Sequence, residues 1–335
     1  PVVCYPVAGY SLGVKASWEP VQEGSGTPSQ ENIRPIKGRA NVMVERCGEN
    51  LLDVAQCRPA SLASAYGLTV TVDDTGLIRV FGTPNVYKDA PRATFRILFT
   101  NQVILTKKYE AKWFVMKGVA NSITRIQSDK SIVLQSPLSP NTPVDIQFRF
   151  MYYTGTTAPT TYTPYIGQTT TLTLPETVYG GEVDAVTGDA KETWKTLTLD
   201  GTENWKYESN SYFVGHNILS NLPTEIDGKC SHFIYSFNFA GNCIFCTGNS
   251  VYTGPELTSK YTDVAAWKTY LAAQYAAGTP VQIAYKLVEP VPFTATGAQP
   301  IPALAGANTV LTDADSVSVS SRADLIRIVR KMQEK

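Results

Sequence analysis

Short runs of alternating polar and apolar residues, separated by turn residues, make up most of this chain. The stretch 174–205 shows the pattern clearly: Gly180-Gly181 and Thr187-Gly188-Asp189 enclose the alternating residues 182–186. Alternation with a period of two is typical of a strand that buries one face. The 24 glycines and 21 prolines supply the turns between such strands. The sequence therefore predicts a mainly β fold.

The length of 335 residues predicts two or three domains. A threonine-rich stretch, 154–171, contains Pro159 and Pro164 and predicts a boundary, with the join at 165–167. Asp73-Asp74-Thr75-Gly76 lies between two alternating runs and predicts a hairpin. The predicted domains are an N-terminal extended arm with a small sheet (1–46), a first β-sandwich or jelly roll (47–166), a second β-sandwich (167–320) and a C-terminal helix (321–335).

One helix is predicted inside the second sandwich, over residues 263–277. Thr262 or Asp263 can cap its start, and Gly278 followed by Pro280 ends it. Its expected apolar stripe would lie on a sheet and consists of Val264, Trp267, Leu271 and Tyr275.

The last residues predict a short amphipathic helix. Ser321 and Asp324 fit a capping pattern. A helix this short is marginal alone, so it must pack on something, either its own domain or a partner subunit. The expected contact residues, for an oligomer or for another particle protein, are Leu325, Ile328, Val329 and Met332.

Charge and hydropathy exclude several classes of partner. Lys plus Arg and Asp plus Glu both number 29, so the net charge is zero, and only 17% of residues are charged. No global field draws such a protein to nucleic acid or to an anionic membrane, and the composition suits a protein inside an assembly. No apolar run is long enough for a membrane helix, and the apolar N-terminus lacks the basic start of a signal peptide. We therefore expect cytoplasmic synthesis, no nucleic-acid partner and no membrane insertion.

Cysteine and histidine form one set with metal-like residue types. Cys230, His232, Cys243 and Cys246 could supply the three thiolates and one imidazole of a tetrahedral zinc site. Their spacing matches no standard knuckle, and in a flat strand Cys243 and Cys246 would point to opposite faces. Six scattered cysteines are also too few for a disulfide framework. Buried thiols are therefore the favoured interpretation, with zinc and a disulfide as alternatives, and no cofactor is predicted.

Aromatic residues suggest a carbohydrate-binding face. Trp194, Tyr207 and Tyr212 are the candidates, because aromatic rings stack on the apolar faces of sugars. The same residues could equally belong to a core, and for Trp205 the core is favoured.

Acidic residues suggest two further chemistries. Glu182, Asp184 and Asp189 could bind calcium, although a solvated turn fits the alternation better. A hydrolase would need a pair of carboxylates in a cleft, and no motif nominates such a pair. Only two histidines are present, which further lowers the expectation of an enzyme, and no catalytic residue is predicted.

A series of local segments carries a family resemblance. They are "WEPVQEGSGTPSQENIRPIKG", "ERCGENLLDV", "LTVTVDDTGLIRVFGT", "YTPYIGQTTTLTLPETVYGGEVDAVTGD", "LTLDGTENW", "KCSHF", "AAGTPVQIAYKLVEPV" and "LAGANTVLTD". Together they resemble minor virion proteins of tailed phages and prophages of Gram-positive, often gut, bacteria, over about residues 15–320. The resemblance implies a tail-tip, baseplate or fibre component linked to host adsorption, and it supplies no catalytic residues.

These observations predict a structural virion protein that is assembled in the host bacterial cytoplasm. Its expected place is the tail, baseplate or fibre, with a role in assembly and in attachment to the host surface. The expected partners are other virion proteins, further copies of the chain, with a trimer favoured, and a glycan of the host surface. Weak contacts would become strong by repetition. The alternatives are a capsid-decorating or head-fibre protein, and a carbohydrate-binding module or depolymerase.

Overall fold

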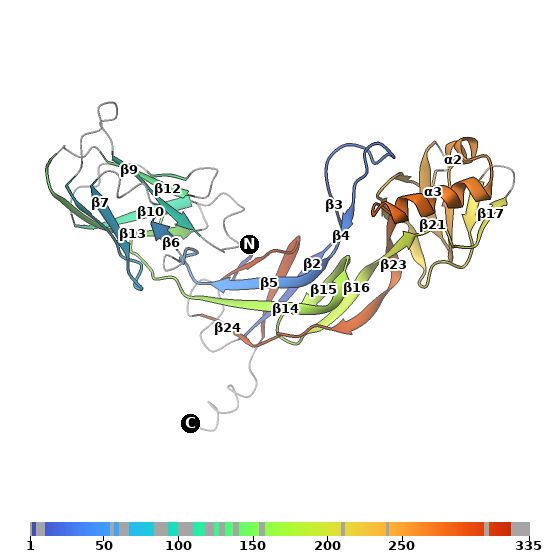
Figure 1. Ribbon diagram of the computed structural model, residues 1–335. Coiled ribbons are helices and arrows are strands. Elements are labelled where there is room, and N and C mark those ends of the chain that lie inside the picture. Colours follow the sequence, from blue (N-terminus) through green and yellow to red (C-terminus); the bar gives the residue numbers. More distant parts are fainter. Residues whose placement is uncertain are drawn as a thin grey trace, which may run out of the picture.

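The computed structural model confirms a mainly β protein. It describes residues 2–4, 11–53, 57–59, 67–83, 93–99, 110–117, 124–126, 131–136, 141–153, 158–208, 212–238, 241–304 and 308–322. Figure 1 shows three β-rich parts in a row, which we call the first end region (57–153), the helical end region (205–222 and 231–278) and, between them, the central body, whose strands are given below.

Two four-stranded sheets form the first end region. In spatial order, one sheet contains β10 (Glu110–Lys117), β13 (Val144–Tyr153), β8 (Ile78–Gly82) and β7 (Leu68–Val72). The other sheet contains, in spatial order, β11 (Thr124–Ile126), β12 (Ser131–Ser136), β9 (Ala93–Phe99) and β6 (Cys57–Pro59). The predicted hairpin is confirmed as β7–β8. Its turn is fixed by Asp73, whose Oδ1 accepts hydrogen bonds from the backbone N–H of Thr75 at 2.9 Å and of Leu77 at 2.8 Å.

Two further sheets pack face to face as the central body. The four-stranded sheet contains β1 (Val2–Cys4), β25 (Asn308–Thr312), β5 (Arg39–Cys47) and β14 (Gly167–Val178). The seven-stranded sheet contains β19 (Pro223–Cys230), β23 (Val281–Thr294), β16 (Asp189–Leu199), β15 (Gly180–Asp184), β2 (Ser11–Trp18), β24 (Ile301–Pro302) and β26 (Ser316–Arg322). The core between them is made by buried side chains that include Leu12, Val14, Val42, Val44, Leu172, Val183 and Val310.

The predicted N-terminal arm is instead part of this body. β5 runs through the predicted boundary after residue 46 and pairs with β14, so that boundary is wrong. β2 lies between β15 and β26 in the seven-stranded sheet. The apolar faces of β2 and β5 need partners to be buried, and strands from 167–199 and 301–322 provide them. The predicted join at 165–167 coincides with the start of β14.

Gly180-Gly181, the pair in the opening pattern, lies where two tryptophans pack against β15. A Cβ built on Gly180 would be 2.3 Å from Cδ1 of Trp194. A Cβ on Gly181 would be 2.6 Å from the carbonyl oxygen of Lys191 and 3.3 Å from Trp18. The glycines are therefore required by close approach of these neighbours.

A five-stranded sheet and two helices form the helical end region. The sheet contains β17 (Trp205–Glu208), β18 (Tyr212–Gly215), β22 (Ser250–Thr253), β21 (Cys243–Thr247) and β20 (Ile234–Tyr235). The helices are α2 (Pro255–Lys260) and α3 (Val264–Ala276).

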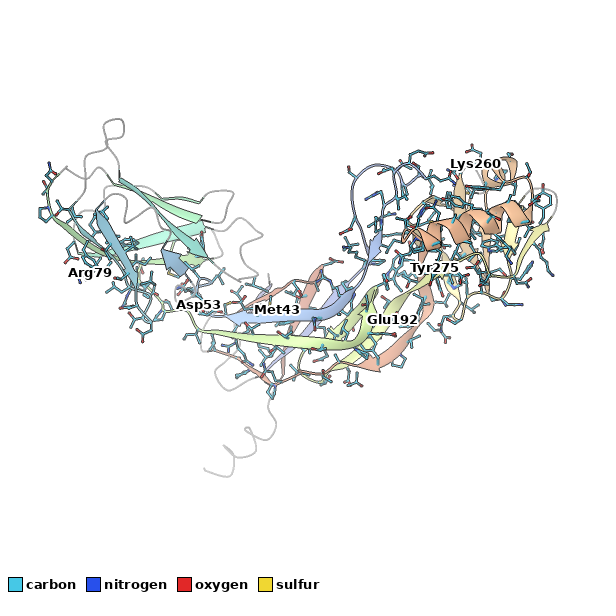
Figure 2. The ribbon with its side chains drawn as sticks, in the orientation of Figure 1. Met43, Asp53, Arg79, Glu192, Lys260 and Tyr275 are labelled. Carbon is cyan, nitrogen blue, oxygen red and sulfur yellow. The ribbon has the colours of Figure 1, made fainter. Side chains whose placement is uncertain are left out.

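The predicted helix at 263–277 is confirmed as α3, with Asp263 as the N-cap that accepts from the N–H of Ala266 at 2.8 Å. Of its predicted stripe, Trp267 and Leu271 are fully buried, whereas Tyr275 is exposed (Figure 2) and that part of the prediction is wrong. Tyr270 packs against the core in its place.

Two features connect the central body to the helical end region. The strands β16 and β23 pair along most of their length, and Leu199 and Ile283 lie in the core of the end region, whereas Ala190 lies in the core of the central body. The second feature is the ribbon β3 (Val21–Gln22) and β4 (Ile36–Lys37), whose loop reaches the end region (Figure 1). There, Gln30 Nε2 donates to the Tyr261 hydroxyl at 2.5 Å.

The predicted C-terminal helix (321–335) overlaps the last described strand, β26. Ser321 lies in β26, where it pairs with Leu12, and not at a helix cap. The predicted contact residues lie outside the described residues; they are Leu325, Ile328, Val329 and Met332.

The molecule exposes more surface than a compact protein of its mass. Its accessible surface is 17463 Å² for 36.5 kDa. A compact monomer of this mass would expose about 13,500 Å². The excess of roughly 4,000 Å² agrees with the row of three parts in Figure 1.

Candidate functional site

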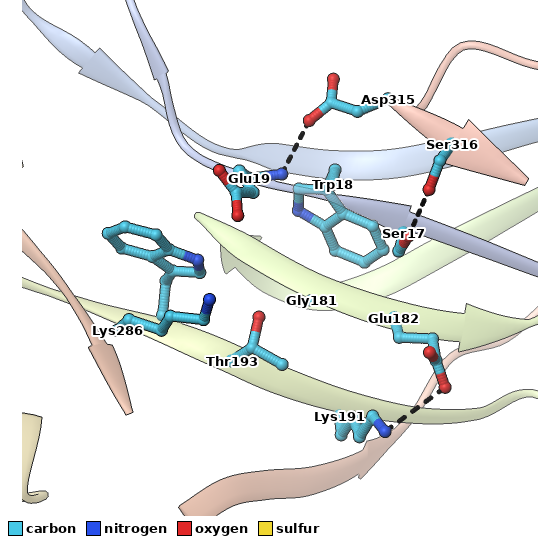
Figure 3. A pocket seen from close by; sticks show the side chains of 11 residues that line it. Ser17, Trp18, Glu19, Gly181, Glu182, Lys191, Thr193, Lys286, Asp315 and Ser316 are labelled. Carbon is cyan, nitrogen blue, oxygen red and sulfur yellow. Dashed lines mark hydrogen bonds and ion pairs between the residues drawn. The ribbon is translucent and has the colours of Figure 1, made fainter. Parts of the chain in front are cut away.

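A pocket of about 480 Å³ lies on the seven-stranded sheet of the central body (Figure 3). It is lined by residues of β2, β15, β16, β23 and β26, by Glu19 directly after β2 and by Asp315 directly before β26. They are Ser17, Trp18, Glu19, Gly181, Glu182, Lys191, Thr193, Trp194, Lys286, Asp315 and Ser316. The lining thus combines segments from both ends of the chain, which only the interleaved pairing of strands brings together.

A β-bulge in β16 shapes this pocket. Gly180 of β15 pairs with Trp194 and Gly181 pairs with Glu192, which leaves Thr193 without an opposite residue. On the other side of β16, the pairing with β23 is also interrupted, between Glu192 and Trp194. A bulge bends the strand and re-aims side chains, and bulges are enriched next to functional sites. The Thr193 side chain lies in the pocket as a result.

Several polar groups of the lining are already paired. The hydroxyls of Ser17 and Ser316 lie 2.6 Å apart, which ties β2 to β26. Asp315 Oδ2 accepts from the backbone N–H of Glu19 at 2.8 Å. Glu182 Oε1 lies 3.5 Å from Lys191 Nζ. These interactions hold the rim of the pocket across four strands, β2, β26, β15 and β16.

The net charge of the lining is small. Three carboxylates, those of Glu19, Glu182 and Asp315, face two ammonium groups, those of Lys191 and Lys286. The lining therefore offers hydrogen-bond donors and acceptors without a strong field of either sign. Such a surface is suited to hydrogen-bonding a polar ligand and is a poor attractor for a highly charged one.

Two indoles lie beneath these polar groups. Trp18 is 2% exposed and its Nε1 donates to the carbonyl oxygen of Val178 at 3.1 Å. Trp194, one of the three carbohydrate candidates, lines the pocket but is only 4% exposed, and Lys229 Nζ lies 5.9 Å from its ring centroid. Trp194 is thus mainly a packing residue that contributes a small part of the pocket surface.

The other two carbohydrate candidates lie elsewhere, in the helical end region. Tyr207 pairs with Phe213 and Tyr212 pairs with Glu208, so the two tyrosines project from opposite faces of the sheet. Tyr212 belongs to a row of rings on its face: its ring centroid is 5.8 Å from that of Tyr252. The structure therefore does not bring the three predicted aromatic residues together.

Sequence reasoning missed Glu19 and Thr193 as pocket residues. Their position depends on the pairing register between β15 and β16, and an alternating pattern does not reveal that register. The Gly180-Gly181 pair was the available sequence signal, since adjacent glycines in a strand mark a bulge or a close approach.

The cysteine–histidine set lies in and beside the core of the helical end region. Cys230, Cys243 and Cys246 are buried free thiols, which confirms the favoured interpretation for them; Cys47 is a fourth. Burial raises the pKa of the Cys230 thiol to about 12 and also raises the pKa of Cys246. In the described part of the chain, no three His, Cys, Asp or Glu side chains converge as a metal site requires.

His232 is held by hydrogen bonds to its own domain. Its Nδ1 lies 2.8 Å from the Ser231 hydroxyl, and its Nε2 lies 3.4 Å from Gln274 Oε1. Burial lowers the pKa of His232, which favours the neutral ring. The geometry makes this histidine part of the packing between β19 and α3.

The acidic residues considered for calcium build a turn. Asp184 Oδ1 accepts from the backbone N–H of Val186 at 2.9 Å and of Thr187 at 3.2 Å. Asp189 Oδ2 accepts from the Thr187 hydroxyl at 2.8 Å. Glu182 instead points to the lysines beside it. These hydrogen bonds support the interpretation as a turn between β15 and β16.

Comparison with known proteins adds no relative. No family model, no curated protein and no solved structure matches the chain. Among the described residues, no helix has the length and apolar character needed to cross a membrane.

Proposed function

We propose that the chain is a structural component of a tailed-phage particle, placed in the tail, baseplate or fibre. The observation that carries this proposal is the extended central body, which joins two separate β-rich end regions (Figure 1). A protein of this form can hold one end region on a particle and present the other at a distance.

The construction of the central body supports a role as a stiff spacer. β14, β16 and β23 have 12, 11 and 14 residues. A strand of this last length spans about 45 Å. β16 and β23 also enter the cores of both the central body and the helical end region, so bending between these two parts would disrupt packed side chains. Multivalent assemblies gain most from such parts, because stiffness preserves the geometry of repeated contacts.

The large exposed surface agrees with a place in an assembly. The excess over a compact monomer, roughly 4,000 Å², follows from the extended form and leaves surface for contacts with other particle proteins. The near-zero net charge has the same implication, because a free protein usually keeps its charge away from zero.

Imaging of the intact particle tests this proposal. Purified virions should contain the chain, and cryo-electron microscopy or labelling with a specific antibody should locate it at the tail apparatus. Signal on capsids that lack tails would instead favour the capsid-decorating or head-fibre alternative. Absence of the chain from particles of confirmed purity would contradict the proposal.

A further inference from the structure

We propose that the pocket beside the Thr193 bulge binds a neutral saccharide unit. This inference goes beyond the particle role and does not depend on it, because it concerns a small-molecule site in the central body. A ligand there would be held by Glu19, Thr193 and Lys286 above the two indoles.

The first argument is that the hollow is built by the local fold. Gly180 and Gly181 lack side chains where Trp194 and Trp18 pack, and Thr193 is the extra residue of a bulge. The resulting pocket, about 480 Å³, lies within the range of roughly 300–1,000 Å³ that small-molecule sites occupy.

The second argument is that some lining groups keep hydrogen-bonding capacity. Figure 3 shows the Ser17–Ser316 and Glu182–Lys191 pairs toward one end of the pocket, and Glu19, Thr193 and Lys286 toward the other. Within the described residues, no side chain or backbone group hydrogen-bonds the Glu19 carboxylate or the Thr193 hydroxyl.

Lys286 is available to a ligand at little cost. Its ammonium lies 3.4 Å from Asp227 Oδ2, and the two side chains are 40% and 51% exposed. An exposed ion pair of this kind contributes little free energy, so a ligand can replace Asp227 as the acceptor. The three groups together offer a carboxylate acceptor, a hydroxyl that donates and accepts, and an ammonium donor.

The third argument concerns ligand chemistry. Each sugar hydroxyl both donates and accepts, so neighbouring hydroxyls match a set of acceptor, mixed and donor groups. The Trp18 and Trp194 indoles are 2% and 4% exposed and form the floor of the pocket, so recognition of the ligand rests on the polar groups. The lining carries one more negative than positive group, which disfavours phosphorylated or other strongly anionic ligands. A neutral saccharide carries neighbouring hydroxyls and no charge, and is therefore the ligand class that meets both conditions.

Saturation-transfer NMR on the full chain tests the proposal. The probes are glucose, galactose, mannose, rhamnose, N-acetylglucosamine and N-acetylgalactosamine, with glucose 6-phosphate as the anionic comparison. At least one neutral sugar should bind saturably with a dissociation constant in the millimolar range. Thr193→Val and Glu19→Gln should each weaken that binding by about fivefold or more, because the first removes a hydroxyl and the second replaces a charged acceptor oxygen by an NH2 donor.

Matched controls separate loss of the site from loss of the fold. Thr198→Val changes an exposed threonine of the same strand, and Glu289→Gln changes an exposed glutamate of β23; both should bind like the unmodified chain. Melting curves by circular dichroism check that every variant is folded. The proposal is overturned if no neutral sugar binds, if glucose 6-phosphate binds more tightly than glucose, or if the two pocket variants bind normally. If only Tyr212→Ala loses binding, the sugar binds beside Tyr212 and Tyr252 in the helical end region, and the pocket proposal is wrong.

Discussion

Replacing Gly180 with alanine tests how the central body is packed. The new methyl carbon would lie 2.3 Å from Cδ1, 2.8 Å from Cγ and 3.1 Å from Cβ of Trp194. Carbon atoms in contact normally lie about 3.5–4.0 Å apart, so the indole must move by about 1 Å or the strand must shift. Trp194 has little room to move, because it is buried against Ile36, Ala284 and Tyr179.

The expected cost follows from two opposing effects. Overpacking of a filled core typically costs about 1–3 kcal/mol. Replacing glycine also restricts the unfolded chain, which stabilises the native state by about 0.4–1 kcal/mol. The Gly180→Ala variant should therefore lose about 1–2 kcal/mol of unfolding free energy. The atoms of Trp194 closest to the new methyl group include Cβ and Cγ, so a change of the Trp194 side-chain rotamer would relieve little of the clash.

Urea unfolding followed by near-ultraviolet circular dichroism measures this cost. Gly48→Ala is the matched control: its methyl carbon would meet only Leu304 Cδ1, at 3.4 Å, which is the flexible end of a side chain. That variant should lie within about 0.5 kcal/mol of the unmodified chain. If Gly180→Ala is equally stable, or if both glycines cost the same, the packing of Trp194 on β15 described above is wrong.

Three more predictions concern the helical end region. Trp267 is fully buried and contacts five aromatic rings, so Trp267→Ala should cost about 3–5 kcal/mol of unfolding free energy. Trp267→Phe should cost clearly less, because it keeps an aromatic ring and removes an indole N–H that finds no hydrogen-bond partner among the described residues. Cys230 and Cys246 should resist a thiol reagent such as DTNB at pH 8 until the chain is unfolded, because burial raises both pKa values; rapid labelling of the native chain would contradict this. His232 has a lowered pKa in the folded state, so the unfolded chain binds more protons as the pH falls below about 6.5 and stability is lost there. His232→Gln should reduce the difference in unfolding free energy between pH 7.5 and pH 5.5, and an unchanged difference would refute the assignment.

Local features of the fold could be predicted from the sequence. The helix α3 was correctly placed because Asp263 and Gly278 mark its ends within a short stretch of chain. The β7–β8 hairpin was predictable for the same reason, since Asp73 organises a turn between adjacent strands. The buried thiols were predictable because the cysteines are too few and too scattered for a disulfide framework and their spacing matches no standard zinc knuckle.

Long-range pairing could not be predicted. An alternating strand such as β5 buries one face against any suitable partner, so its sequence does not select β14, which lies far along the chain. The pocket also depends on long-range strand pairing, because the bulge at Thr193 is defined by the register between β16 and β15. Trp194 illustrates the limit: an aromatic residue in an alternating strand fits either a core or a ligand face, and only the packing on Gly180 shows that it is mostly buried.

Small-angle X-ray scattering of the purified chain tests the central claim, that an extended interleaved β body separates two end regions. A compact protein of 335 residues would have a radius of gyration of about 20 Å. The arrangement in Figure 1 predicts a value clearly above this and a distance distribution with a long tail. A radius near 20 Å with a symmetric distribution, measured on a monomeric sample, would contradict the account.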